Sequence, residues 1–168
     1  GLEFAGTVVG VGDRVSGRAV GDVVMGVVGG GAYAEQLVVH ERQTMRVPTS
    51  VGLPEAGAVP EVAITAYDAL VLQGGLTAGG WALVHAGGSG VGTAAIQLAH
   101  AVGARVAVTC STAKVAACAE LGADVVVDYT SDDFVAAVRD ATEGAGVDVV
   151  LDVIGGDYVA RNLQSCRI

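Results

Sequence analysis

From residue 81 onward, short apolar runs alternate with longer segments of helical spacing, and glycine separates most of them. Apolar runs without polar alternation are typical of strands that are buried on both faces of a parallel sheet. We expect strands at 81–85, 105–110, 125–127 and 147–154, and helices at 93–102, at 112–121, after a Ser131 cap and from Asp157. This strand–helix alternation predicts an α/β fold with a doubly wound parallel sheet.

The first part of the chain has a different pattern, in which short β-branched runs are divided by Gly and Asp. We expect strands at 6–12, 23–28, 32–39 and 45–47, which predict a compact antiparallel barrel or sandwich. A helical segment follows, with Pro54 in its first turn, an interruption at Pro60 and Gly74-Gly75 at its end. The expected organisation is therefore a barrel portion at 1–52, a connecting segment at 53–80 and a nucleotide-binding portion at 81–168.

One motif carries the strongest functional signal: a glycine-rich turn between the first expected strand and helix of the second part. Its residues are Gly87, Gly88, Ser89, Gly90, Val91 and Gly92. Small residues let the backbone approach a pyrophosphate, and N–H groups at a helix start attract the anion. Ser89 departs from the general pattern, because it occupies the middle glycine position. The alternative is a purely structural tight turn.

The end of the second expected strand bears on which dinucleotide is bound. An NAD site places Asp or Glu there to accept from the ribose 2′-hydroxyl, whereas this region reads Thr-Cys-Ser-Thr-Ala-Lys at 109–114. Ser111 and Lys114 are able to donate to a 2′-phosphate instead, which is the interpretation we favour. The alternative is that Lys114 is a solvated helix-face residue. Tyr129 either packs as an ordinary half-buried tyrosine or hydrogen-bonds beside the same site.

Charge and composition exclude other classes. The net charge of −9 argues against nucleic-acid binding, and 4% aromatic residues argue against a stacking platform for single strands. The uncharged stretch between Asp68 and Arg105 is broken by glycine pairs, so we expect no membrane span. Three cysteines without a CxxC pair, and no secretory leader pattern, predict reduced thiols in a cytoplasmic protein.

Metal and hydrolase chemistry lack their motifs. His40, His85 and His100 are scattered, so we expect no zinc site, and His85 reads as a satisfied core residue or a neighbour of a cofactor. His100 has no evident partner in the sequence. A serine nucleophile elbow needs G-x-S-x-G, and the residues before Ser89 do not supply that spacing. No Gly-Lys-Ser/Thr completes a phosphate-binding P-loop.

The motifs taken together resemble a known family. The matching segments are Gly1–Gly6, Gly21–Val24, Tyr33–Glu35, Leu72–Leu76, His85–Ala99 and Gly144–Asp148. They are similar to the medium-chain dehydrogenase/reductase superfamily, specifically its zinc-free NADPH:quinone oxidoreductase branch. Gly1-Leu2-Glu3 has leucine where the zinc-dependent branch carries a metal-binding histidine. The resemblance implies a partial GroES-like barrel followed by a partial Rossmann domain.

The resemblance also implies an activity and a binding site. NADPH would contact Thr65, the glycine-rich turn (Gly87, Ser89, Gly90, Val91 and Gly92), the pocket formed by Ser111, Lys114 and Tyr129, and Gly155. The reaction would be hydride transfer to a quinone or related conjugated carbonyl without metal, with catalytic residues unknown. Enoyl reduction and non-catalytic NADPH binding remain alternatives. We expect the chain to be part of a longer protein, because it starts at Gly1 and stops within a helical pattern. The resemblance implies that this longer protein is a homodimer.

Overall fold

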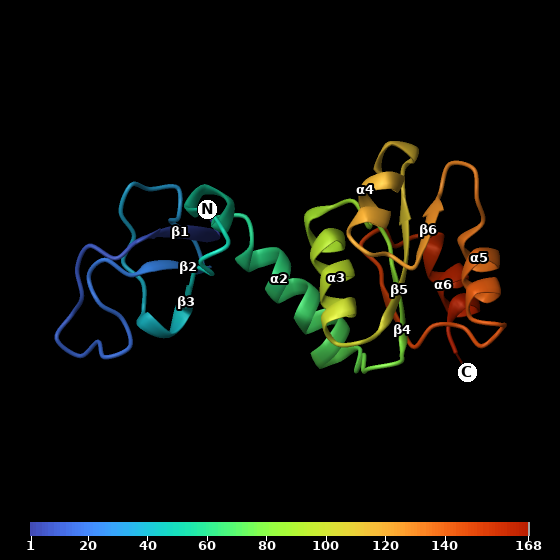
Figure 1. The fold of residues 1–168 in the computed structure, drawn as a ribbon, viewed down its shortest axis with the longest axis horizontal. Coiled ribbons are helices and arrows are strands. Elements are labelled where there is room, and N and C mark those ends of the chain that lie inside the picture. Colours follow the sequence, from blue (N-terminus) through green and yellow to red (C-terminus); the bar gives the residue numbers. More distant parts are fainter. Residues whose placement is uncertain (168) are drawn as a thin grey trace. The chain divides into compact units, whose positions relative to one another are not determined.

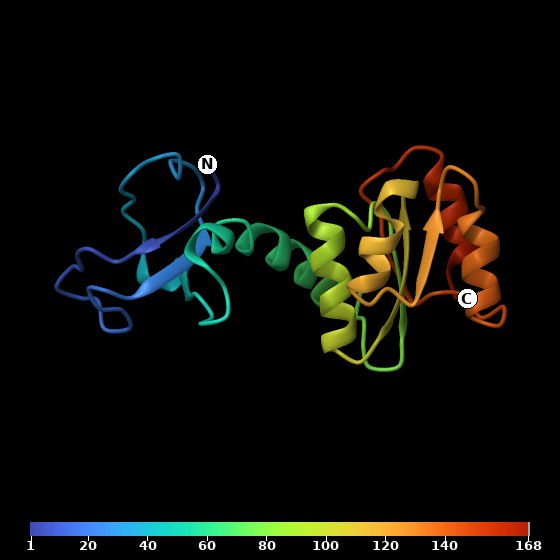
Figure 2. The same ribbon diagram turned by 45° about the horizontal axis from the view of Figure 1, so that its top comes forward.

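A computed structural model describes residues 1–167. The chain forms two compact units, which we call unit 1 (Gly1–Ile64) and unit 2 (from Thr65 onward). Figure 1 and Figure 2 show both units in colours that follow the sequence. Within the described residues, no helix has the length and apolar character needed to cross a bilayer.

Unit 1 is built on a small antiparallel sheet. Strands β1 (Glu3–Thr7), β2 (Val23–Val27) and β3 (Thr44–Arg46) lie in the order β1-β2-β3. The central strand β2 contributes Val24 and Met25 to a small core that also contains Ala56. A short 3₁₀ turn (Glu41–Gln43) leads into β3, and helix α1 (Leu53–Ala56) follows it.

Two of the expected strands in unit 1 are wrong in extent or in kind. The strand expected at 6–12 is β1, which ends at Thr7. The segment expected as a strand at 32–39 contains bends and no strand. Tyr33 and Val38 are almost fully exposed, at 95% and 101%, so alternation there does not mark a buried face. Gly30 and Gly31 before it have positive φ angles, which redirect the backbone away from a pairing geometry.

Unit 2 is built on a parallel sheet of four strands in the order β6-β5-β4-β7. The division between the units falls inside α2 (Pro60–Tyr67). The helical segment is interrupted between Ala56 and Pro60, as expected, and Pro60 begins the new helix. A π-helical turn, η2 (Asp68–Gln73), ends at Gly74 as expected. The remaining elements are β4 (Trp81–Val84), α3 (Gly90–Ala101), β5 (Arg105–Cys110), η3 (Thr112–Lys114), α4 (Val115–Glu120), β6 (Val125–Asp128), α5 (Phe134–Ala141), β7 (Val149–Leu151) and α6 (Tyr158–Ser165).

Helices cover both faces of the unit 2 sheet, which confirms the predicted α/β class. In Figure 1, α3 and α4 lie on one side of the strands, and α5 and α6 lie on the other. One buried cluster packs under α3 and α4 and includes Ile96, Val106 and Val108. A second cluster packs under α5 and α6 and includes Trp81, which is 4% exposed, and Phe134. All four residues of β4 are buried, as the apolar run predicted.

Two helix and strand ends in unit 2 differ from expectation. Asp133 caps α5, because its carboxylate accepts from the Val135 N–H at 2.9 Å, and the predicted cap Ser131 lies before the helix. Strand β7 stops at Leu151 although the apolar run continues to Ile154. The carboxylate of Asp152 accepts from the N–H groups of Ile154 and Gly155, so the backbone turns there.

Candidate functional site

The topology of unit 2 singles out one edge of its sheet. The chain passes from β4 outward through β5 to β6, and then returns to the other side of β4 for β7. The connections that leave β4 and β7 therefore run in opposite directions along the sheet, and the switch point lies between these two strands. In open α/β sheets, ligands bind outside the carboxyl ends of the strands at this switch point. The glycine-rich turn follows β4, and the loop 152–156 follows β7, so both flank it.

The glycine-rich turn has the close packing that requires glycine. The N–H of Gly87 donates to the carbonyl of Thr109 on β5 at 2.8 Å. A Cβ atom on Gly87 would lie 2.6 Å from the Val108 side chain, and one on Gly92 would meet the carbonyl of Ala86. Ala86 itself has a φ of 56°, the left-handed region that non-glycine residues rarely adopt. The turn therefore brings strand and helix too close together for side chains.

Ser89 caps helix α3, so the residue that departs from the general motif has a structural role. Its Oγ accepts from the N–H of Gly92 at 3.0 Å. The hydroxyl satisfies one of the N–H groups that the first helical turn leaves without an intrahelical acceptor. Ser89 and Gly90 are exposed, and Val91 is half-buried. An anion approaching the start of α3 would meet the remaining N–H groups and the positive end of the helix dipole.

Lys114 reaches the glycine-rich turn from η3, the short helix that follows β5. Its ammonium donates to the carbonyl of Gly88 at 2.7 Å. Its aliphatic stem packs against Gly88 so closely that a Cβ on Gly88 would lie 2.5 Å from Lys114 Cδ. The side chain is exposed, yet its amine has a definite partner, so it is not simply a solvated helix-face residue. Ser111 lies just after β5, at the start of the short helix that carries Lys114.

One acidic residue on β6, the strand beside β5, was not predicted from the sequence. Asp128 ends β6 and is paired in register with Cys110, the last residue of β5. Hydroxyl groups of Thr112 and Thr130 hydrogen-bond to its carboxylate and lower its pKa below the ordinary value. The carboxylate absent from β5 is thus present on the neighbouring strand. The sheet register, which no local pattern fixes, was the missing signal.

Three further predicted site residues have different surroundings. Tyr129 follows Asp128 with its side chain 52% exposed, so it does not pack in a core. Gly155 has a φ of +70° in the loop after β7, where its N–H donates to Asp152 at 2.9 Å. Thr65 is half-buried on α2, and no hydrogen bond joins it to the turn in residues 1–167.

His85 lies just before the turn and is buried, which agrees with its predicted role as a satisfied core residue. Its ring nitrogens contact Thr109 Oγ1 at 2.9 Å and Asn162 Oδ1 at 2.7 Å, and burial lowers its pKa.

His100, expected to lack a partner, instead contacts the Gly122 carbonyl. No group of three His, Cys, Asp or Glu side chains in residues 1–167 could hold a metal ion. The cysteines are free, and burial beside Cys118 raises the pKa of Cys110 to about 11.

Comparisons with known proteins agree with this architecture. Residues 90–168 match the family model described as "Zinc-binding dehydrogenase". The chain is 40% identical over 166 residues to the phenolphthiocerol synthesis polyketide synthase Pks15/1 of Mycobacterium marinum, covering 98% of this chain and 8% of the relative. It is 35% identical to a quinone oxidoreductase-like protein 2 homolog of Nematostella vectensis, covering 98% of this chain and 46% of the relative.

A solved structure extends the likeness to three dimensions. The chain superposes on the apo form of JamJ enoyl reductase with a TM-score of 0.86 and 34% identity, covering all of this chain and 51% of that one. The chain therefore spans about half or less of the length of the proteins that it matches.

Proposed function

We propose that the chain belongs to the medium-chain dehydrogenase/reductase superfamily, binds NADPH and serves an oxidoreductase. The match of residues 90–168 to the zinc-binding dehydrogenase family model supports this proposal. The supporting observation is the geometry at the carboxyl end of β4. The capped start of α3, the glycine-rich turn with its few side chains and the side chain of Lys114 lie together there. A dinucleotide pyrophosphate has the charge and size that such a helix start accepts. The residues present therefore fit the cofactor.

Lys114 supports the choice of NADPH over NADH. An ammonium group that already reaches the turn is placed to form a charge-assisted hydrogen bond with a 2′-phosphate. Asp128 opposes this choice, because a carboxylate repels phosphate, but its Oδ1 accepts from both the hydroxyl and the N–H of Thr130. Ser111, which makes no cap hydrogen bond, has its hydroxyl available for the phosphate.

The proposed reaction is reduction of a quinone or related conjugated carbonyl. NADPH, when bound, supplies the hydride, and the protein positions the cofactor and excludes water. No metal is assigned, because Leu2 stands at the position where the resemblance puts a histidine ligand. The relative from Nematostella vectensis, named for quinone oxidoreduction, supports this acceptor.

A second candidate is reduction of the alkene of an enoyl thioester. It is favoured by the polyketide synthase relative at 40% identity and by the superposition on JamJ enoyl reductase. Both candidates place a hydride on a conjugated acceptor and require the same cofactor site. They differ only in the acceptor.

The acceptor test is NADPH oxidation by the purified protein in three conditions: 1,4-benzoquinone, crotonyl-CoA and no acceptor. Faster oxidation with benzoquinone supports the first candidate, and faster oxidation with crotonyl-CoA supports the second. Equal, slow rates in all three conditions despite NADPH binding would leave a dinucleotide-binding protein without either activity. Absence of NADPH binding would overturn the proposal as a whole.

A further inference from the structure

A chain of buried hydrogen bonds runs beneath the carboxyl edge of the sheet in unit 2. Thr109 Oγ1 contacts His85 Nδ1 at 2.9 Å, and His85 Nε2 contacts Asn162 Oδ1 at 2.7 Å. Asn162 Nδ2 then donates to Asp152 Oδ2 at 2.8 Å. His85, Thr109 and Asn162 are all buried, so these groups exchange hydrogen bonds with each other instead of with water. We call this set the His85 relay.

The direction of every bond in the His85 relay follows from its acidic end. An ionised carboxylate only accepts hydrogen bonds, so the amide nitrogen of Asn162 faces Asp152 and its oxygen faces His85. That oxygen needs a donor, which assigns the proton of the neutral ring to Nε2. Nδ1 is then an acceptor, and the Thr109 hydroxyl donates to it. Burial, which disfavours the charged ring, lowers the pKa of His85.

The residues at both ends of the His85 relay, Asp152 and Thr109, accept hydrogen bonds from backbone N–H groups of the two loops at the switch point. Asp152 Oδ1 accepts from the N–H groups of Ile154 at 2.7 Å and Gly155 at 2.9 Å, which shapes the loop after β7. At the other end, the carbonyl of Thr109 accepts from the N–H of Gly87 in the glycine-rich turn. The two segments that flank the proposed cofactor are therefore joined through side chains.

We propose that Asp152 is a positioning residue for the bound dinucleotide, holding loop 153–156 in place and coupling it through Asn162 and His85 to the glycine-rich turn. This inference rests on the proposed function, because it requires a dinucleotide at the switch point. Oδ1 of Asp152 accepts from both loop N–H groups, and Oδ2 accepts from the Asn162 amide. The two functions of Asp152 can therefore be separated by substitution.

Asp152→Asn tests the direction of the relay. Its single oxygen still accepts from the two loop N–H groups, while its NH2 group now faces Asn162. The Asn162 amide must then rotate and present its nitrogen to His85, which moves the ring proton from Nε2 to Nδ1. Nitrogen-15 NMR of the His85 ring distinguishes the two tautomers. Asp148→Asn, a carboxylate at the amino end of β7 that accepts from the Trp81 N–H at 2.8 Å, is the matched control and should leave the tautomer unchanged.

Asp152→Ala tests the positioning of the loop. We expect the dissociation constants of NADPH and NADH, measured by calorimetry, to rise by the same factor of about ten, since loop 153–156 does not read the 2′-phosphate. Amide hydrogen exchange should accelerate at residues 153–156 and not in helix α3. Asp152→Asn, which retains both loop hydrogen bonds, should bind both cofactors within about twofold of the wild type.

The outcomes separate this inference from the proposed function. If the wild type binds neither cofactor, the proposed function fails together with the positioning role, while the tautomer still reports whether the His85 relay exists. If the wild type binds NADPH but Asp152→Ala binds it equally well, the function stands and the positioning role is overturned. A His85 ring that keeps its proton on Nε2 in Asp152→Asn would overturn the coupling.

Discussion

The Lys114 side chain is exposed, and its ammonium nevertheless donates a hydrogen bond to the backbone carbonyl of Gly88. Lys114 is also the only lysine in a chain with 9 basic and 18 acidic residues. Its stem lies against Gly88, so the charge and the packing of this residue contribute separately. A substitution that keeps the stem can isolate the contribution of the charge.

Lys114→Met should weaken NADPH binding and leave NADH binding nearly unchanged. Loss of a charge-assisted hydrogen bond to phosphate is worth roughly 1.5–3 kcal/mol, which corresponds to a roughly 10- to 150-fold higher dissociation constant. Calorimetric titration with both cofactors measures the ratio. Equal losses for NADPH and NADH would show that Lys114 does not bind the 2′-phosphate.

Asp128→Asn is expected to act in the opposite direction. Removing the negative charge at the end of β6, the strand beside β5, while keeping an amide oxygen for the Thr130 N–H should strengthen NADPH binding several-fold. NADH binding should change less, because NADH lacks the 2′-phosphate. The same titration, repeated at high salt, should reduce the difference if it is electrostatic. Weaker NADPH binding would instead indicate that the carboxylate holds the adenosine ribose.

His85 should make the stability of unit 2 depend on pH. Its pKa is lowered in the folded state, whereas an unfolded histidine binds a proton below about pH 6.5. The stabilisation from the neutral ring is therefore complete above about pH 6.5 and is lost progressively as the pH falls below it. Urea unfolding at about pH 7.5 and about pH 5.5 should show a larger loss for the wild type than for His85→Gln. Parallel losses in the two proteins would contradict this assignment.

At the scale of elements, the packing of α3 against β4 and β5 depends on Gly92. The helix start lies so close to the preceding turn that a Cβ at this position would meet the Ala86 carbonyl and the Gly87 backbone. A backbone obstacle cannot move aside as a flexible side chain can. The helix would have to shift away from the sheet, and the buried cluster beneath it would be disturbed.

Gly92→Ala should therefore lower the free energy of unfolding of unit 2 by about 1–3 kcal/mol, the usual range for overpacking. Gly6→Ala in unit 1, where a Cβ would meet nothing within 4 Å, controls for the glycine-to-alanine change itself; it should not lower the stability of unit 1, measured by circular dichroism. Urea denaturation followed by Trp81 fluorescence measures the effect in unit 2. A Gly92→Ala protein as stable as the wild type would show that α3 can relax without loss.

Elements with a strong local signal could be predicted from the sequence, and those set by distant contacts could not. The expected strand at 105–110 is β5 with the same bounds, because both its burial and its ends are encoded locally. The segment 32–39, also expected as a strand, pairs with no strand among residues 1–167 and contains bends. The position of the turn motif was predictable, whereas the pairing of Asp128 with Cys110 and the contact of Asp152 with Asn162 arise only from the order of the strands and helices.

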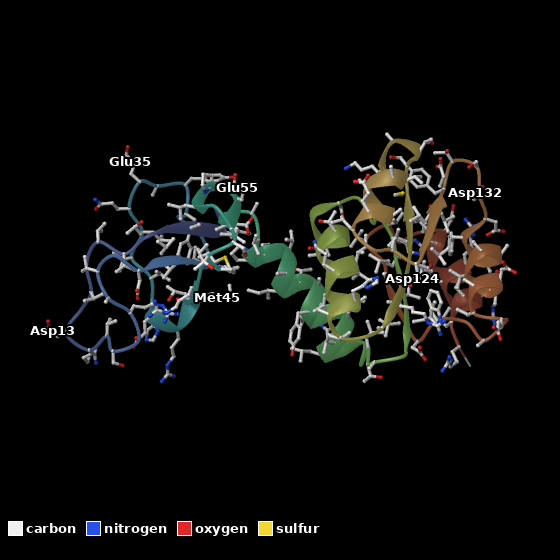
Figure 3. All side chains as sticks on the ribbon, viewed as in Figure 1. Asp13, Glu35, Met45, Glu55, Asp124 and Asp132 are labelled. Atoms are coloured by element: carbon white, nitrogen blue, oxygen red, sulfur yellow. The ribbon has the colours of Figure 1, made fainter. Side chains whose placement is uncertain are left out.

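At the scale of the whole molecule, the two units have very different cores. In unit 1 the buried apolar side chains are Val24, Met25, Ala56 and Pro60, whereas unit 2 contains two apolar clusters. Figure 3 labels Asp13 and Glu35 on the loops of unit 1 and Asp132 before α5, and all three carboxylates are exposed. Charge therefore lies on the surface of both units, while apolar burial is concentrated in unit 2.

Unit 1 is accordingly expected to unfold at a lower urea concentration than unit 2, because less apolar area is buried there. The single tryptophan, Trp81, lies in the core of unit 2, so its fluorescence reports only that unit. Circular dichroism reports both units and should begin to change before the fluorescence does. Coincident transitions by the two methods would show that the units unfold together.

Trp81 lies at the amino end of β4, and the glycine-rich turn begins just past the other end of the same strand. Six residue steps separate Trp81 from Gly87, which is at most roughly 20 Å of extended chain. Excited indole transfers its energy efficiently to a reduced nicotinamide chromophore over such distances. The protein therefore contains a built-in optical donor, and cofactor emission on tryptophan excitation would report occupancy of the site without any label.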